Sequence, residues 1–476
     1  MVLGGARECD MAEWIATEMA GLDLGDQRLN DRQCLLLERF SANPQGSIPE
    51  SLQGWAETQA AYRFFDNKKV TAESVLAPHR QATLERIRQN GVVLVLQDTT
   101  ELELDRSPEG GFGKLTYESR IGLMDHTRLA ITPDGLCLGV TGCDIWARPI
   151  ENPHAGTRNE ERAIEDKESL RWLTGYRDAN EIAKEAPQTM IVSIADRESD
   201  IYECFLETPE PAVGQSAHWI TRAAQNRRLR PQKDDDSQEK KLRTALADLP
   251  VKAQRVVRIG ARANQPAREA SVEIRAGRIT LRAPDRKDQK LPNKTVHVVW
   301  VREPHPPEGS EPVDWVLLTS LPVETTADVL RVVDWYAARW WIEIYFRTYK
   351  QGCQVERLQL QTVDRVTPAL ALYKIVAWRL QYVTMLGREC PHVSCETVFA
   401  PAEWRCSWPI ATGHPAPATP PTLGEFLRLV AGLGGYLGRK HDGPPGPEVM
   451  RRGLRRVFDF SLAWATYNAL EGKTCV

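Results

Sequence analysis

Residues 336–350 constrain the fold of this chain more than any other stretch, and they read YAARWWIEIYFRTYK. If they form one helix, each residue advances roughly 100° around the axis, so Tyr336, Arg339, Glu343 and Lys350 fall within an arc of about 60°. Nearly all the other positions are aromatic or aliphatic, so we expect the helix to be largely covered by the rest of the protein. A line of charged groups on a covered helix needs partners from elsewhere in the chain.

Two interpretations of these charged groups are open. Arg339 and Glu343 lie four residues apart and Arg347 lies one turn further on, which is the spacing of a helical salt-bridge ladder worth a few tenths of a kcal/mol per pair. Alternatively, Glu343 holds a metal ion while the neighbouring Arg and Lys side chains bind phosphate. The spacing alone does not distinguish the two.

Length and composition indicate a globular protein. A chain of 476 residues with 42% hydrophobic content is long enough for about two to four domains. No apolar run approaches the length of a membrane span, and residues 1–10 have no apolar signal core, so we expect neither a membrane protein nor a secreted one. The ten cysteines form no CxxC pair, which is typical of a reducing compartment.

The net charge of -3 hides a strongly basic region. Residues 222–302 contain 21 Lys and Arg against 9 Asp and Glu, so the rest of the chain is correspondingly acidic. A basic segment of this size indicates a polyanionic partner, and the competing interpretation is a solvated loop.

Two apolar runs of strand length, residues 92–96 and 190–195, are each followed by an aspartate, Asp98 and Asp196. An aspartate after a strand is commonly only a helix cap or a turn residue. Between the two runs, the pattern predicts a hairpin over 121–140 that turns at 133–135, and a charged helix over 160–177 that ends near Gly175.

The remaining segments have simpler patterns. The first 85 residues predict short helices at 14–19, 31–40 and 55–65. The basic region predicts strands, which we interpret as an insertion into the main domain, at 218–222, 254–259, 270–275, 278–282, 295–301 and 315–319. Helices are expected at 368–387 and over 422–470, separated by a Pro-rich loop, and no phosphate-binding GxxxxGK[ST] loop is present, so ATP is not implied.

Three carboxylates on two strands and one helix suit metal-dependent phosphoryl transfer. Two Mg²⁺ ions about 3.5 to 4 Å apart activate a water and neutralise the leaving oxygen, and carboxylate oxygens are suitable ligands. Asp98, Asp196 and Glu343 match this description in order and in element type. A histidine-based site is poorly supported, because the nine histidines show no HxxxH or HxH spacing.

The chain resembles the IS4 family of DDE transposases. The resemblance is carried by LQDTT at 96–100, DRESDI at 196–201 and the pattern Y-(2)-R-(3)-E-(6)-K from Tyr336 to Lys350, which is specific to that family. Supporting matches, which extend over nearly the whole chain and are typical of the Tn5-like members, are LGD at 24–26, AYRF at 61–64, KES at 167–169, GRITL at 277–281 and WVLLTS at 315–320.

The resemblance implies an α/β fold: an RNase H-like catalytic core of the retroviral integrase superfamily, interrupted by a β-strand insertion and flanked by helical domains. The implied domains are a DNA-binding domain at 1–85, a catalytic domain at 86–385 with its insertion at about 205–320, and a dimerisation domain at 386–476 with a Pro-rich loop at 408–421.

The resemblance also implies roles for individual residues. Asp98, Asp196 and Glu343 would bind two Mg²⁺ ions, with Mn²⁺ as a substitute, for cleavage through a DNA hairpin and for joining of 3′-OH ends to target DNA. The residues expected to contact DNA are Tyr336, Arg339, Arg347, Lys350 and Arg222 at the cleaved strand, Trp315 at a flipped base, and Arg28, Arg32 and Arg63 at the transposon end. Trp315 also suits a plain core position. Leu29 follows Arg28 where the relatives have a second Arg, so the end sequence is expected to differ.

The implied partners are double-stranded DNA, at transposon ends and target, and a second copy of the chain, with no membrane and no nucleotide cofactor. The implied location is the bacterial cytoplasm, at the nucleoid through DNA binding. The alternatives are a catalytically inactive DNA-binding regulator of transposition, a host nuclease of the same fold, and a structural interaction protein. The complete set of carboxylates disfavours the first, and the charged helix disfavours the last.

Overall fold

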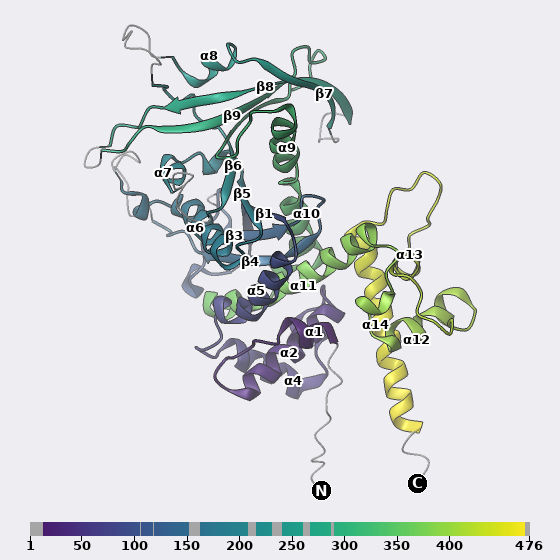
Figure 1. The fold of residues 1–476 in the computed structure, drawn as a ribbon. Helices are drawn as coiled ribbons and strands as arrows, with labels where there is room; N and C mark the ends of the chain where they lie inside the picture. The colour runs from purple at the N-terminus through teal and green to yellow at the C-terminus, as the bar shows by residue number, and fades with distance from the viewer. Residues whose placement is uncertain are drawn as a thin grey trace.

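The protein folds as a central sheet with helices on both faces, and its terminal helices lie at one end (Figure 1). The computed structural model describes residues 13–471 except 105, 118, 152–161, 208–215, 231–239, 260–266 and 287–289. Part of the predicted helix 160–177 lies outside these residues.

The chain begins with a group of helices, where three were predicted. They are α1 (Glu13–Glu18), α2 (Gln27–Ala42), α3 (Ile48–Ser51), α4 (Gly54–Phe65) and α5 (Ala72–Arg88). The Asp26 side chain caps α2 by accepting a hydrogen bond from the Arg28 amide at 3.0 Å. The apolar spacing that predicted α2 and α4 buries Phe40 and Phe64 in the main core. The helices α3 and α5 were not predicted.

Within the described residues, ten strands form one mixed sheet. They are β1 (Val92–Glu103), β2 (Gly113–Lys114), β3 (Ile121–Ile131), β4 (Cys137–Trp146), β5 (Met190–Ala195), β6 (His218–Arg222), β7 (Val251–Ile259), β8 (Arg268–Leu281), β9 (Lys294–Arg302) and β10 (Asp314–Thr319). The order is β2-β3-β1-β5-β6-β10-β9-β8-β7, with β4 also paired to β3. Strands β1, β5 and β6 are parallel and β3 is antiparallel to β1, which is the sheet of an RNase H-like core and confirms the predicted fold class.

The alternation of side chains along the strands assigns each residue to one of two faces. Leu94 and Leu96 of β1 pack in the core shared with α9 (Thr326–Ala337), α10 (Trp340–Arg347) and α11 (Val363–Glu389), which we call the α10 face. Val93 and Val95 pack in the other core with α6 (Leu170–Glu185) and α7 (Tyr202–Leu206), the α6 face. Even-numbered residues of β1 therefore point to the α10 face.

The first apolar strand is longer than predicted, so Asp98 does not follow its end. Pairing of β1 with β5 stops at Leu96, but the antiparallel ladder with β3 continues to Glu103 and places Asp98 opposite Thr127. Backbone pairing with a neighbour, which the local pattern does not reveal, extends the strand beyond its apolar run. The hairpin turn at 133–135 is confirmed, with Gly135 at a φ of 97° between β3 and β4.

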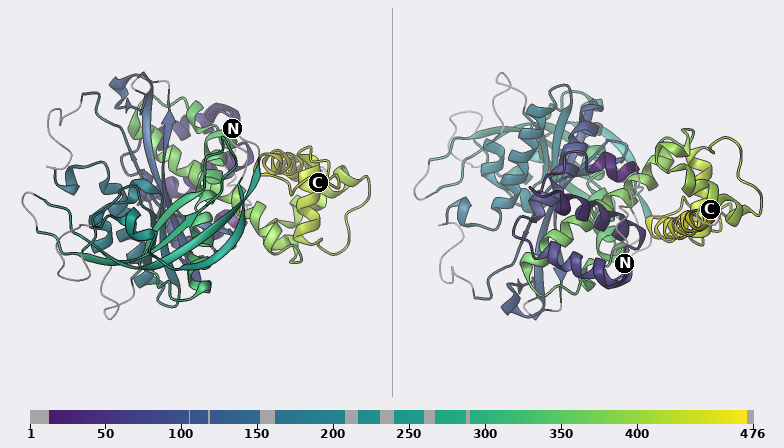
Figure 2. Two further views of the ribbon diagram at one scale, coloured as in Figure 1. Left: turned by 90° about the horizontal axis from the view of Figure 1, so that it is seen from above. Right: turned by 90° about the horizontal axis from the view of Figure 1, so that it is seen from below.

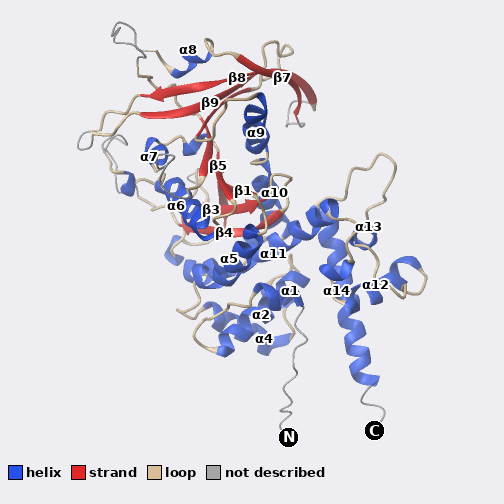
Figure 3. Ribbon diagram, in the orientation of Figure 1, coloured by secondary structure: helices blue, strands red, loops and turns tan. Residues whose placement is uncertain are grey.

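The basic insertion extends the core sheet. Strand β6, predicted with the insertion, pairs in parallel with β5, and β10 joins β6 to the antiparallel strands β9, β8 and β7. Figure 3 shows β7, β8 and β9 at the top of the molecule. The two strands predicted at 270–275 and 278–282 are one continuous strand, β8, because Gly277 pairs with Val298 in the ladder without a break. The short helix α8 (Leu242–Leu246) packs on this region.

Helix α6 runs through Gly175 instead of ending there. A Cβ on Gly175 would lie 2.1 Å from the Gln97 side-chain oxygen, so this glycine permits close approach of α6 to β1 rather than a helix end. The predicted boundary was wrong because glycine marks both situations in a sequence.

Residues 336–350 do not form one helix. Helix α9 ends at Ala337, and a tight turn follows. In this turn the Arg339 amide donates a hydrogen bond to the Tyr336 carbonyl at 3.0 Å, and the Trp341 amide donates one to the Ala338 carbonyl at 3.0 Å. Helix α10 follows, and a π-helical turn over Thr348–Gly352, η5, closes with a bond from the Cys353 amide to the Thr348 carbonyl. The predicted cover is also incomplete, because Trp340 is 57% exposed.

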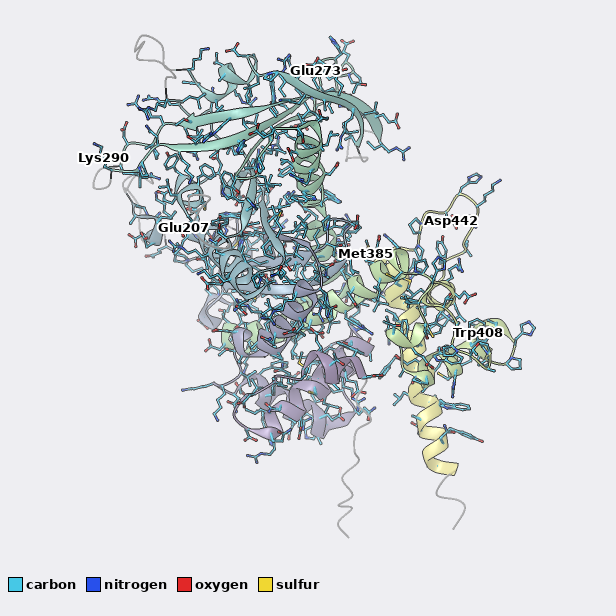
Figure 4. The ribbon with its side chains drawn as sticks, in the orientation of Figure 1. Glu207, Glu273, Lys290, Met385, Trp408 and Asp442 are labelled. Atoms are coloured by element: carbon cyan, nitrogen blue, oxygen red, sulfur yellow. The ribbon has the colours of Figure 1, made fainter. Side chains whose placement is uncertain are left out.

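The C-terminal helices form a unit beside the body. They are α12 (Pro401–Thr412), α13 (Leu423–Leu433) and α14 (Pro447–Glu471), and the predicted loop 408–421 is helical up to Thr412. Figure 2 shows the unit set to one side in both views. In Figure 4, Met385 near the end of α11 lies where the unit joins the body, whereas Trp408 and Asp442 lie out on the unit.

Two expectations from composition can be compared with the structure. The eight cysteines among the described residues are all free. In the described part of the chain, no helix is both long enough and apolar enough to cross a membrane.

Candidate active site

Two of the predicted carboxylates meet at one arginine on the α10 face. Arg339 at the turn before α10 donates from Nη1 to Asp98 Oδ2 at 2.8 Å and from Nη2 to Glu343 Oε1 at 3.2 Å. The Asp98 side chain is 17% exposed and that of Glu343 is 38% exposed. The arginine thus bridges a carboxylate of the sheet and a carboxylate of α10, and the salt-bridge interpretation of the Arg339 and Glu343 spacing describes only part of the arrangement.

Burial controls the ionisation of Asp98. Desolvation raises its pKa from 3.8 to about 7, although the Arg339 guanidinium and the bond from the Thr99 amide at 2.8 Å act in the opposite direction. The negative charges of Asp196 and Glu343 also contribute to this raised pKa. The Asp196 and Glu343 carboxylates therefore lie close enough to Asp98 to disfavour its charged form.

Asp196 is placed at the carboxyl end of β5, as predicted, but its carboxylate has a local partner. Its Oδ1 accepts a hydrogen bond from the Glu198 amide at 2.8 Å, so Asp196 also caps the short 3-10 turn Arg197–Ser199. Among the residues that the structure describes, no three His, Cys, Asp or Glu side chains converge tightly enough to hold a metal ion. Arg339 occupies the space between Asp98 and Glu343 instead.

The donor set fits hard divalent cations. The three side chains offer only carboxylate oxygens, which suit Mg²⁺ and Mn²⁺. Half-buried negative charges with a raised Asp98 pKa indicate a site short of positive charge, which a divalent cation would supply.

The residues predicted to contact DNA are brought together in part. Tyr336 lies at the end of α9, and its ring meets the Trp315 ring edge-on with centroids 5.5 Å apart. Trp315 is half-buried against the core, so both its predicted interpretations remain possible. Arg222 on β6 donates to the Asp314 carbonyl at 3.1 Å beside them.

Lys350 and Arg347 diverge after α10. Lys350 Nζ donates to the Glu101 carbonyl at 2.7 Å and pairs with Glu356 at 3.1 Å, because the π-helical turn rotates it away from the line predicted for a regular helix. Arg347 is exposed. In the N-terminal helices, Arg28 and Arg63 are exposed and Arg32 is half-exposed, and Arg28 pairs with Asp26 at 2.9 Å.

A polar network that the sequence did not suggest lies on the α6 face behind the two aspartates. Arg171 donates to Thr99 Oγ1 at 2.9 Å and to Glu198 Oε2 at 2.8 Å, and Thr99 bonds to His126 Nδ1 at 2.9 Å. Burial holds the pKa of His126 well below its usual value, so the ring is neutral. His126 continues to Gln97 at 3.3 Å. Thr99 and Gln97 flank Asp98, so this network fixes the strand that carries it.

A buried ion pair was also missed. Lys374 of α11 is fully buried and bonds to Asp125 at 2.7 Å and to Thr127 Oγ1 at 2.6 Å, both on β3. Its ammonium lies 4.7 Å from the Tyr349 ring centre. The only sequence signal was a lysine within an apolar helix. Because Thr127 pairs with Asp98 between β1 and β3, this cluster holds α11 against the sheet next to Asp98.

Comparison with known proteins defines the class. Residues 194–379 match the family model described as a transposase DDE domain. Together with the sheet topology, this match makes the chain a DDE transposase with an RNase H-like catalytic domain.

Two further matches narrow the assignment. Residues 11–70 match a transposase DNA-binding model, and residues 375–470 match the model named transposase Tn5 dimerisation domain. The chain therefore belongs to the Tn5-like transposases of the IS4 family, and its partners are DNA and a second copy of itself.

The similar solved structures include the piggyBac transposase synaptic complex with hairpin DNA, determined by cryo-EM. It is 8% identical with a TM-score of 0.37, over 76% of this chain and 67% of that chain.

Proposed function

We propose that this transposase is a cut-and-paste enzyme in which Asp98, Asp196 and Glu343 hold two Mg²⁺ ions, with Mn²⁺ as a substitute. The observation that carries the proposal is the bridge from Asp98 through Arg339 to Glu343, with the charge of Asp196 acting on the same carboxylate. The ions, when bound, supply an activated water and neutralise the leaving oxygen.

Arg339 is positioned to hold the scissile phosphate. Its guanidinium already spans the two carboxylates, and the fork of donors suits two phosphate oxygens. When DNA binds, the Arg339 guanidinium moves from the two carboxylates to a phosphate, so its charge is paired both before and after binding. Arg347, Lys350 and Arg222 bind neighbouring phosphates.

The second step forms a hairpin at the transposon end, which requires one base to leave the stack at a cost of a few kcal/mol. Trp315 receives this base, and Tyr336 supports the indole ring from the side, in keeping with their edge-on contact. Opening of the hairpin and joining of the 3′-OH ends to target DNA are in-line phosphoryl transfers at the same carboxylates.

End recognition belongs to the N-terminal helices, through Arg28, Arg32 and Arg63. The distal half of α14 carries exposed apolar side chains and forms the contact with the second copy, so that each subunit binds one end and cuts the other. DNA binding holds the protein at the bacterial nucleoid.

The decisive experiment is cleavage of DNA carrying the element's own ends, with and without Mg²⁺, resolved on a denaturing gel. We expect Mg²⁺-dependent nicks followed by hairpins. Glu343→Ala should bind the ends as the wild type does but make no nicks, because it loses a metal ligand and keeps the N-terminal helices. Wild-type protein that binds the correct ends and leaves them uncut would favour the inactive regulator.

A further inference from the structure

A basic pocket of about 680 Å³ lies where α14 meets the rest of the molecule, away from the carboxylates. We call it the arginine pocket. Its lining includes Arg452, Arg455 and Arg456 of α14, the turn after α13, and Gln45 from the connection between α2 and α3. None of these residues was singled out by the family motifs.

The floor of the arginine pocket is held by contact between backbones. A Cβ on Gly434 would lie 2.0 Å from the Val449 carbonyl oxygen, and one on Gly453 would lie 1.9 Å from the Val430 carbonyl oxygen. Only glycine allows α13 and α14 to pack this closely. The arginines therefore project from a fixed backbone.

The positive charge of the arginine pocket is only partly neutralised: bonds to Ser47 lower the pKa of the nearby Glu50 carboxyl, and the Arg455 charge lowers it further. Arg451 is used in the fold, since it pairs with Glu448 at 2.6 Å and is 6% exposed. Arg452, Arg455 and Arg456 are exposed, and within the described ranges none of the three has a carboxylate oxygen within 4.0 Å. Asp459 is the one acidic residue among those that line the pocket.

The arginine pocket connects three functional parts of the chain. Gln45 belongs to the segment that matches the DNA-binding model, and its Nε2 donates to the Gln351 carbonyl at 3.1 Å. Gln351 lies in η5, one residue after Lys350, and α14 also contacts α2. The arginine pocket therefore lies between a segment that matches the DNA-binding model and the turn that follows α10.

We propose that the arginine pocket binds the phosphate backbone of the duplex held by the N-terminal helices. Exposed guanidinium groups on one helix suit phosphate oxygens, and such contacts add affinity without reading bases. The inference rests on the DNA-transposase assignment, but it requires neither metal binding nor the hairpin step. The competing occupant is an acidic surface of the second copy.

The test compares two double variants in the full-length protein. Arg455→Ala/Arg456→Ala removes two charges from the pocket, whereas Arg405→Ala/Arg428→Ala removes two exposed charges from α12 and α13 outside it. Dissociation constants are measured for an end duplex and for an unrelated duplex of equal length, between roughly 50 and 200 mM salt.

For the pocket variant we expect weaker binding to both duplexes, about tenfold at the lowest salt, and an unchanged preference for the end. The slope of log affinity against log salt should fall by about 2, one for each lost phosphate contact. The control variant should match the wild type, and Arg455→Lys/Arg456→Lys should keep most of the wild-type slope.

Three results would overturn the inference. Unchanged affinity and slope in the pocket variant, with wild-type DNA binding intact, would refute the pocket and leave the proposed function standing. A weaker dimer with unchanged DNA binding would assign the pocket to the second copy. Failure of the wild type to bind any DNA would refute both proposals.

Discussion

At the scale of single residues, the candidate site is defined by competition for one buried carboxylate. Asp98 lies on a strand where burial favours its protonated form, and Arg339 only partly offsets that cost. A divalent cation at this position would replace both the proton and the arginine. The ionisation of Asp98 therefore depends on which positive charges lie beside it.

Asp98→Asn should reveal the cost of burying the ionised Asp98 carboxylate, when it is measured in the absence of divalent ions. The pKa of Asp98 is raised to about 7 in the folded protein from 3.8, so between these values the folded state holds a proton that the unfolded chain has released. Stability of the wild type therefore falls as pH rises through this window, by up to about 1 kcal/mol per pH unit. The variant has no carboxyl group at this position and lacks this loss. The free energy of unfolding of the variant relative to the wild type, measured by urea unfolding, should therefore rise from pH 4 to 7 and then stay constant. A difference that does not change with pH would contradict the assigned burial.

Trp315→Ala tests the second step of the proposed reaction. If the indole stacks on a flipped base, its loss removes about 1 to 3 kcal/mol of stacking, so hairpin formation should slow roughly ten- to hundredfold while the first nick is unchanged. Trp315→Phe should recover part of the rate. Quench-flow samples on a denaturing gel separate the two steps. Equal slowing of both steps would indicate that Trp315 is a core residue and does not stack on a flipped base.

At the scale of elements, the site depends on how α10 and α11 are held against the sheet. The tight turn at Ala338–Arg339 places Arg339 between β1 and α10, and η5 directs Lys350 toward the Glu101 carbonyl. The buried pair of Lys374 and Asp125 fixes α11 on β3 directly beside Asp98.

Lys374→Met should destabilise the protein by about 3 to 5 kcal/mol, because it leaves the Asp125 carboxylate buried and unpaired. The double variant Lys374→Met/Asp125→Leu removes both charges and should recover most of this loss. Urea unfolding measures each. A double variant as unstable as the single one would show that the ion pair specifies the packing itself.

At the scale of the whole molecule, α14 joins the parts of the chain. Its first half packs on α13 and carries the arginine pocket, and its distal half projects from the body (Figure 1). Exposed apolar side chains on that half are Leu462, Trp464, Tyr467 and Leu470. Because this exposed apolar surface lies in a segment that matches a dimerisation model, we expect it to contact the second copy.

Trp464→Glu should weaken the dimer at least tenfold, because it places a charge in an apolar contact. Ala465→Glu, about 100° further round the helix and away from Leu470, is the matched control. Sedimentation measures the dimer, and binding of a single end should be unchanged while cleavage of paired ends is lost. A dimer that persists in Trp464→Glu would place the contact elsewhere.

The sequence by itself determined the protein family and the fold class. Three motifs name Asp98, Asp196 and Glu343, and two continuous apolar runs predict a strand before each aspartate, because residue type and local pattern are properties of the chain. It could not determine the length of β1, the turn at Ala338, or the passage of α6 through Gly175, because these depend on partners distant in the sequence.

Only the tertiary structure decided which charges meet. Arg339 reaches Asp98 from 241 positions away, and Lys374 pairs with Asp125 across 249. The arginine pocket likewise forms only where Gln45 approaches α14. Contacts of this kind follow from the packing of whole elements, so no local pattern in the sequence predicts which residues will meet.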